Sequence, residues 1–171
     1  MTLEGIKRFY FIGIGGIGMS ALARYFKAKG FDVAGYDKTP SPLTDELQKE
    51  GIGVHFEDLG SNIPAEYQQL DSTLVVYTPA IPKNMGELVY VQQAHTVLKR
   101  SEVLGLITQT SKGLGVAGTH GKTTTSTMLA YVLSQSHLNC SAFLGGISSN
   151  FNSNVLVEPD AVYSVHYPWR E

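Results

Sequence analysis

The chain has 171 residues, a formal net charge of −2, and 43% hydrophobic against 16% charged residues. This composition predicts a buried core, and it excludes a disordered chain and a basic nucleic-acid-binding surface as the main function. The single Cys140 excludes an internal disulfide and a multi-cysteine metal site, and no apolar run reaches the length of a membrane span. Since the N-terminus has the pattern of a strand and not of a signal peptide, the chain is expected to be cytoplasmic.

The first hundred residues alternate predicted strands with predicted helices. A continuous apolar run over 8–14 predicts a buried parallel strand, and apolar residues at helical spacing from Met19 predict a helix that ends at Gly30. Further elements are expected as strands at 32–37, 52–56 and 72–82 and as helices at 43–51, 86–95 and 101–108. This alternation predicts an α/β fold, with helices on the faces of a Rossmann-like parallel sheet.

A second unit is expected to begin at residue 100. Residues 1–99 then form the Rossmann-like domain, and residues 100–171 form the incomplete first part of a P-loop α/β domain. Its predicted elements are a strand at 114–118, a loop at 119–123, a helix at 123–136 and a strand at 140–146. The residues expected on one packed side of that helix are Met128, Leu129, Val132 and Leu133. A last strand begins at residue 161 without a helix to cover it, so the second domain is expected to be cut.

The sequence "GIGGIG" at 13–18 follows a predicted strand and opens a predicted helix. Its glycines fit G-x-G-x-x-G, a pattern that lets a pyrophosphate approach the backbone and the N–H groups of a helix N-terminus. Asp37 follows 19 residues after Gly18, at the end of the second strand, where a carboxylate accepts a ribose hydroxyl. Thr78, in the loop at 77–82 that ends the fourth predicted strand, is expected to face the same crevice. A nicotinamide dinucleotide is the simplest ligand for this pattern, and a UDP-sugar fits it too.

A second glycine-rich turn, "GTHGKT", lies at 118–123. The P-loop pattern G-x-x-x-x-G-K-[ST] would begin with a glycine at position 116, where this chain has Val116. The other parts of the pattern are present. Backbone N–H groups surround the β-phosphate, Lys122 reaches the β- and γ-oxygens, and the Thr123 hydroxyl can hold Mg²⁺. The chain is therefore expected to carry a triphosphate site and a separate pyrophosphate site. A ligase that activates an acid on a nucleotide-linked substrate requires both.

Four stretches within residues 6 to about 165 resemble the Mur ligases: "FIGIGGIGMSALA", "GTHGKTTTS", "RSEVLGLI" and "AFLGGISSNFNSN". The resemblance implies three domains, of which this chain holds the UDP-sugar domain and the start of the ATP domain. The UDP-sugar contacts that it implies are Gly15, Gly16, Ile17 and Gly18 at the pyrophosphate and Asp37 near the uridine. The ATP and Mg²⁺ contacts that it implies are Gly118, Thr119, His120, Gly121, Lys122, Thr123 and Thr124.

The activity implied by this resemblance is ATP-dependent amide-bond formation in bacterial peptidoglycan synthesis. ATP transfers its γ-phosphoryl group to the lactyl carboxylate of UDP-N-acetylmuramate, which gives an acyl phosphate and releases ADP. The amine of L-alanine then attacks the acyl phosphate, with release of phosphate. The catalytic residues implied are Lys122 and Thr123, because Lys122 and Mg²⁺ offset the charge on the transferred γ-phosphoryl group.

The chain departs from the family pattern after "YSV". The family continues there with E-A-D-E, whose Glu binds Mg²⁺, whereas this chain continues with "HYPWRE". The hypothesis is a truncated or frame-shifted product that binds the UDP-sugar without turnover, and in which His166, Trp169 and Arg170 have no role. Two alternatives stay open: an NAD(P)-dependent oxidoreductase domain and a non-catalytic UDP-sugar-binding module.

Three further side chains have expected places. Cys140 is expected in the core, because it lies on an apolar strand. His55 is expected to be a strand-end residue and not a catalyst. Glu87 is expected within reach of the UDP-sugar crevice.

Overall fold

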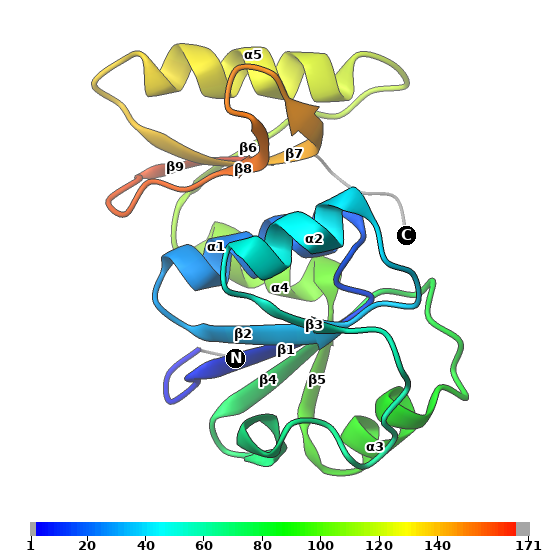
Figure 1. Cartoon of the computed structure of the whole chain (residues 1–171). Coiled ribbons are helices and arrows are strands. Elements are labelled where there is room, and N and C mark those ends of the chain that lie inside the picture. The colour runs from blue at the N-terminus through cyan, green and yellow to red at the C-terminus, as the bar shows by residue number, and fades with distance from the viewer. Residues whose placement is uncertain (1–2, 167–171) are drawn as a thin grey trace. The chain divides into compact units, whose positions relative to one another are not determined.

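The computed structural model describes residues 3–166 (Figure 1). The chain divides into two compact units, residues 1–103 and residues 104–171. The division falls inside helix α4, Arg100–Gln109. Within residues 3–166, no helix combines the length and the apolar character needed to cross a membrane.

The first unit is built on a sheet of five parallel strands. In spatial order these are β3 (Gly53–His55), β2 (Asp32–Tyr36), β1 (Arg8–Ile12), β4 (Thr73–Tyr77) and β5 (Thr96–Lys99). The sequence order reverses on either side of β1, so the carboxyl ends of β1, β2 and β4 meet around one crevice. The prediction of an α/β fold with a parallel sheet is confirmed. Strand β5 was not predicted.

Helices cover both faces of this sheet. The helices of the unit are α1 (Ile17–Ala28), α2 (Pro42–Lys49), the 3₁₀ turn η1 (Ala65–Gln68) and α3 (Gly86–Ala94). Figure 1 shows α1 and α2 on one face, and η1 with α3 on the other. The alternating side chains of β1 reach both layers: Phe9 stacks on Phe26 of α1 with 3.6 Å between ring centroids, whereas Tyr10 meets Tyr67 of η1. Burial on both faces explains the continuous apolar run of this strand.

The second unit has a four-stranded sheet in the order β6 (Lys112–Gly115), β9 (Tyr163–His166), β7 (Cys140–Ser148) and β8 (Ser153–Leu156). The first three strands are parallel, and β8 pairs antiparallel with β7. Helix α5, Lys122–Ser134, packs on this sheet around a core that includes Ala130, Leu133 and Val165. Cys140 is fully buried beside the same helix, as expected.

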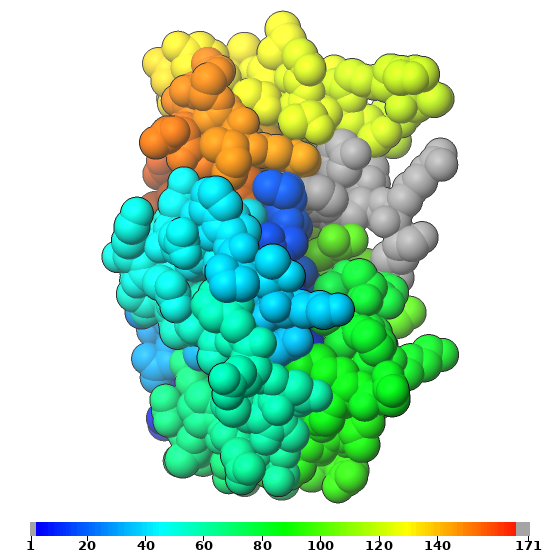
Figure 2. Space-filling model, turned by 45° about the vertical axis from the view of Figure 1, so that its right-hand side comes forward, coloured from blue at the N-terminus to red at the C-terminus, as the bar shows by residue number. Residues whose placement is uncertain are grey.

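The prediction for the packed side of α5 was partly wrong. Leu133 is buried and Leu129 packs against the core, but Met128 and Val132 are each 64% exposed. The side that meets the sheet runs through Ser126, Ala130 and Leu133, at helical spacing. Two of its members are small, so the apolar periodicity of the sequence pointed to the wrong side. Figure 2 shows this helix, in yellow, at the surface.

Candidate functional site

The first glycine turn connects β1 to α1 at the carboxyl edge of the sheet. Gly13 has φ +90°, and a Cβ atom there would lie 2.9 Å from the Thr78 methyl carbon, so only glycine fits. The N–H groups of Gly13 and Ile14 both donate to the carbonyl of Tyr36, which holds the turn against β2. Thr78 therefore lies beside the turn.

The N-terminus of α1 opens from this turn. Gly16 is its N-cap residue, no side chain caps it by a hydrogen bond, and its first turn contains no acidic residue. Backbone N–H groups at such a helix end favour an anion. The predicted contacts Gly16, Ile17 and Gly18 lie at this helix end.

Asp37 lies directly against the glycine turn. Its Oδ2 accepts the N–H of Gly15 at 2.7 Å, and its Oδ1 accepts the N–H of Thr39 at 3.2 Å. A Cβ atom on Gly15 would stand 2.8 Å from the same Oδ2, so the contact requires glycine. The carboxylate is thereby fixed at the end of β2, where a ribose hydroxyl can donate to it.

A cavity of about 480 Å³ lies at the same edge of the sheet. Its lining residues are Tyr36, Lys38, Asp58, Ala80, Ile81, Pro82, Asn84 and Met85. An aromatic ring, aliphatic side chains and a few polar groups suit a planar nucleobase. Lys38 and Asn84 were not predicted as site residues, although the loop after β4 was already expected to face the crevice.

Asp58 shapes the wall of this cavity. Its carboxylate accepts the N–H groups of Gly60, Gly86 and Glu87, so it caps the N-terminus of α3. Burial opposes ionisation of this carboxyl, but the three N–H donors outweigh burial and hold the pKa of Asp58 below its ordinary value. The carboxylate is charged at neutral pH and ties the loop after β3 to α3.

The expectation that Glu87 reaches the UDP-sugar crevice was wrong. Glu87 is fully buried, and its carboxylate is paired with the Tyr10 hydroxyl at 2.8 Å, with His55 Nε2 at 2.8 Å and with the N–H of Leu59 at 3.0 Å. Burial and the charge of Glu87 raise the pKa of Tyr10. His55 ends β3, as expected. This buried network joins β1, β3 and α3 and has a structural role.

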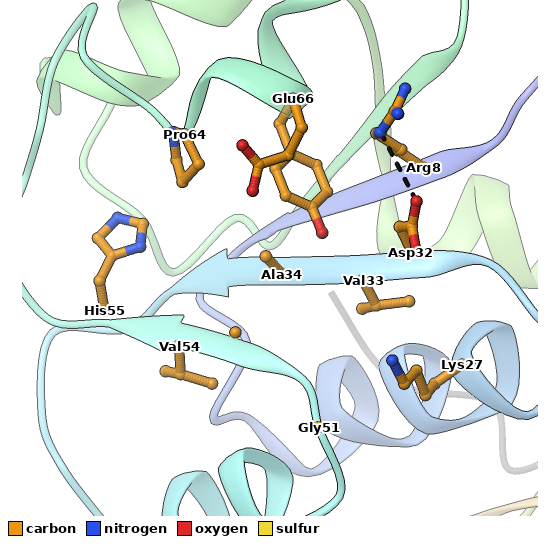
Figure 3. Close-up of a pocket in the computed structure, with 12 residues that line it drawn as sticks. Arg8, Lys27, Asp32, Val33, Ala34, Gly51, Val54, His55, Pro64 and Glu66 are labelled. Carbon is orange, nitrogen blue, oxygen red and sulfur yellow. Dashed lines mark ion pairs between the residues drawn. The ribbon is translucent and has the colours of Figure 1, made fainter.

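A larger cavity, of about 550 Å³, lies mainly at the amino ends of the strands (Figure 3). Arg8 begins β1 and Asp32 begins β2, and Figure 3 shows their ion pair, with 3.7 Å between Nε and Oδ2. Pro64 and Glu66 lie on one side of the strands and Lys27 on the other. Since parallel α/β sheets bind ligands at their carboxyl edge, the smaller cavity beside the glycine turn is the stronger candidate.

The second glycine-rich turn lies between β6 and α5. Gly121 is the left-handed N-cap residue of α5, with φ +75°, and Lys122 begins the helix. The ammonium of Lys122 donates to the carbonyl of Gly118 at 2.7 Å and to that of Thr119 at 3.4 Å. The lysine side chain therefore lies along the loop. Residues 117–121 are all exposed, so a ligand has access to them.

The missing glycine of the P-loop pattern has a structural explanation. Val116 packs against the core of the second unit, and its N–H donates to the carbonyl of His166 at 3.0 Å. This residue thus continues the pairing of β6 with β9 instead of joining the flexible part of the loop. The turn itself begins at Gly118, whose φ is +152°.

The described residues do not form a metal centre. Within residues 3–166, no three His, Cys, Asp or Glu side chains are grouped so that they could hold a metal ion. The carboxylates of residues 104–166 are Glu158 and Asp160. Both precede β9, and the N–H of Glu158 donates to Ser141 near the start of β7. They therefore lie at the opposite edge of the sheet from the loop at 118–124.

Of the three residues after Val165 for which no role was expected, the structure describes one, His166. His166 is 7% exposed, and its ring stacks on Phe143 with 5.7 Å between centroids. Its Nε2 shares a hydrogen with Ser164 Oγ at 2.6 Å. Trp169 and Arg170, for which no role was expected, lie outside the described residues.

The chain matches the model of the Mur ligase family, catalytic domain, over residues 8–112. A UDP-N-acetylmuramate–L-alanine ligase of Porphyromonas gingivalis W83 is 61% identical over 153 residues, which are 89% of this chain and 34% of that protein. The enzyme of the same name from Parabacteroides distasonis is 54% identical over 167 residues, 96% of this chain and 36% of that protein. The chain thus spans about a third of the length of these curated relatives.

Two solved structures have a similar fold. The UDP-N-acetylmuramate–alanine ligase of Thermotoga maritima has a TM-score of 0.77 and 31% identity, over 92% of this chain and 36% of that one. A UDP-N-acetylmuramate:L-alanyl-γ-D-glutamyl-meso-diaminopimelate ligase from Neisseria has a TM-score of 0.79 and 28% identity, over 94% of this chain and 52% of that one.

Proposed function

The chain belongs to the Mur ligase family, and we propose that it is the N-terminal part of a ligase that joins L-alanine to UDP-N-acetylmuramate. The relatives with the highest identities quoted above carry that name. The observation that carries the proposal is the presence of two glycine-rich turns in one chain, each between a strand and a helix. A bacterial cytoplasmic role in peptidoglycan precursor synthesis follows from the same proposal.

The first unit binds the UDP moiety of the substrate. The pyrophosphate lies at the N-terminus of α1, beside Gly16, Ile17 and Gly18, where the positive end of the helix dipole favours an anion. The N–H of Gly15 is taken by Asp37, so this carboxylate is oriented for the ribose and not displaced by the phosphates. The uracil enters the cavity between Tyr36 and Ile81, and Thr78 closes the turn from the side of β4.

The second unit binds the phosphates of ATP. The loop comprises Gly118, Thr119, His120, Gly121, Lys122, Thr123 and Thr124. Lys122 supplies positive charge next to the β- and γ-phosphates, and the N-terminus of α5 supplies N–H donors. In the full-length enzyme, this charge offsets the charge that builds on the γ-phosphoryl group as it moves to the lactyl carboxylate. The amine of L-alanine then displaces phosphate from the acyl phosphate.

Mg²⁺, which the family resemblance implies, does not fit the residues described here. The loop at 118–124 lies at the carboxyl ends of the parallel strands and offers Mg²⁺ the Thr123 hydroxyl. Residues 104–166 place no carboxylate at that end of the sheet. Residues 104–166 are therefore proposed to bind ATP without adding a carboxylate ligand for a metal ion. No residue of this chain is assigned to L-alanine, and we expect binding of UDP-N-acetylmuramate and ATP without ligation.

An NAD(P)-dependent oxidoreductase is the second candidate, because Asp37 and the glycine turn also suit the ribose and pyrophosphate of a dinucleotide. Calorimetric titration of the purified chain with UDP-N-acetylmuramate, NAD and NADP distinguishes the two functions. The proposal predicts binding of the UDP-sugar and no heat from either dinucleotide. Binding of a dinucleotide without binding of the UDP-sugar would replace the ligase assignment with the oxidoreductase. Binding of none of the three would refute the assignment of the first turn.

A further inference from the structure

The loop at 118–124 lies at the carboxyl edge of the second sheet, beside the end of β9. Strand β9 pairs in parallel with β6 on one side and with β7 on the other. His166, the last residue of β9, stands in register with Gly115 of β6, and its carbonyl accepts the N–H of Val116 just before the loop. A side chain at the end of β9 is therefore next to the base of the loop.

In proteins with a P-loop, Mg²⁺ is bound by phosphate oxygens of the nucleotide, by the loop hydroxyl and by a carboxylate at the end of a neighbouring strand. Mg²⁺ requires oxygen ligands in a nearly octahedral arrangement, and carboxylates commonly supply its protein ligands. In this chain the end of β9 carries His166. An imidazole is a poor ligand for Mg²⁺, which selects carboxylate, carbonyl and water oxygens.

The imidazole of His166 is also directed away from the α5 side of the sheet. Val165 packs in the core beneath α5, so its neighbours Ser164 and His166 lie on the opposite face. There the ring stacks on Phe143 and shares a hydrogen with Ser164, while its Nδ1 is buried without a hydrogen-bond partner. Burial lowers the pKa of His166 to about 4, so the ring is neutral at pH 7. It supplies neither a negative charge nor an oxygen ligand to the loop.

The carboxylates of residues 104–166 do not supply the oxygen ligand that His166 lacks. Glu158 and Asp160 stand before β9, near the start of β7, and hence at the other end of the parallel strands. The charges that the loop brings to a ligand are therefore positive: the ammonium of Lys122 and the positive end of the α5 dipole. These positive charges attract a polyphosphate most strongly when no Mg²⁺ ion neutralises the negative charge of the polyphosphate.

We propose that the loop at 118–124 binds the polyphosphate of ATP as the metal-free anion, and that Mg²⁺ does not strengthen this binding. The inference rests on the proposed function in one respect, the assignment of ATP to this loop. It differs from the implied family site, in which the metal is part of the nucleotide complex. Lys122 and the N-terminal N–H groups of α5 are the groups that hold the anion.

The test is calorimetric titration of the full chain with ATP, once with EDTA and once with excess Mg²⁺. The inference predicts that binding in EDTA is as tight as, or tighter than, binding with Mg²⁺. Lys122→Ala is expected to weaken binding in EDTA by about tenfold or more, because a charge-assisted contact is lost. Lys112→Ala is the matched control, since it removes the same charge from the start of β6, at the other edge of the sheet.

The outcomes separate this inference from the proposed function. Binding that is tightened about tenfold or more by Mg²⁺ would overturn the inference and leave the ATP assignment intact. No ATP binding under either condition would overturn both the inference and the ATP assignment, while UDP-sugar binding would still be tested separately.

Discussion

The carboxylate of Asp37 accepts the backbone N–H of Gly15, with 2.7 Å between Oδ2 and the nitrogen. The two residues lie 22 positions apart in the chain, and the contact joins the end of β2 to the turn between β1 and α1. It fixes the Asp37 carboxylate beside the expected ribose position, next to the helix N-terminus where we propose that the pyrophosphate binds. The account of the first site depends on this arrangement.

Asp37→Ala is expected to weaken binding of UDP-N-acetylmuramate by about tenfold or more, because a charge-assisted hydrogen bond to the ribose is lost. Asp37→Asn retains an acceptor but not the charge, so it is expected to have a smaller effect. Calorimetric titration of each variant with UDP-N-acetylmuramate measures the change in affinity. Asp71→Ala is the matched control, since Asp71 is exposed and lies outside the site. Unchanged affinity in Asp37→Ala would remove this carboxylate from the site.

Gly13→Ala is expected to destabilise the first unit and to weaken UDP-sugar binding. The new methyl group would meet the Thr78 methyl carbon at 2.9 Å and Ile81 Cδ1 at 3.2 Å. Gly30→Ala is a matched control, because Gly30 has nearly the same φ, +88° against +90°, but nothing within 4 Å of its added Cβ. Both variants lose about 1–2 kcal/mol to backbone strain. Urea unfolding is expected to show a larger loss for Gly13→Ala, and equal losses would contradict the close packing at this turn.

Glu87→Ala is expected to lower the free energy of unfolding by about 3 kcal/mol, because three buried or half-buried donors lose their acceptor. The contact partners are Tyr10, His55 and Leu59. Glu66→Ala serves as the control, since Glu66 is an exposed residue of η1. Chemical denaturation measures the free energy of unfolding of both variants. A Glu87→Ala protein of unchanged stability but lost UDP-sugar affinity would restore the view that this carboxylate belongs to the ligand site.

His166 gives the second unit a specific pH dependence. Its pKa is lowered to about 4 by burial, so the folded state favours the neutral ring. The stability from this residue is fully present above the unfolded-state pKa, about 6.5, and is lost as the pH falls from there towards 4. A shift of this pKa from about 6.5 to about 4 corresponds to about 3 kcal/mol in the free energy of unfolding. Hydrogen exchange of the β7 and β9 amides at pH 7 and pH 5 is expected to show faster opening at pH 5.

His166→Phe is expected to flatten this dependence, because phenylalanine retains a ring against Phe143 and has no titrating group. A single-residue pH titration followed by NMR provides an independent value for the pKa. A wild-type His166 that titrates near 6.5 would contradict the burial of its ring.

Much of the first unit could be predicted from its sequence. The apolar run of β1 and the helical spacing of α1 gave the right elements, because both faces of the sheet are buried under helices. Strand β5 was missed because its four residues lie between two helices with no turn residues to separate them. In the second unit, β8 was missed, and β6 ends earlier than predicted, at Gly115 instead of residue 118.

The site was predictable where one local pattern defines it. The glycine turn and the spacing to Asp37 give the position of that carboxylate, because a strand–helix–strand unit has a regular length. The buried network of Glu87 was not predictable, since its partners Tyr10, His55 and Leu59 come from three separate segments. Lys38 and Asn84 reach the cavity through loops that no periodicity describes. The residues that would contact each ligand remain predictions.

NMR mapping of the backbone amides, on addition of UDP-N-acetylmuramate to the chain, tests the central claim most directly. The account predicts that the largest shift changes fall on the glycine turn at 15–18, on Asp37, on Thr78 and on the cavity residues Lys38 and Asn84. It predicts no change around the larger cavity at Arg8, Lys27 and Glu66. Shift changes confined to the larger cavity or to the loop at 118–124, with the glycine turn unaffected, would contradict the assignment of the UDP-sugar to the first turn.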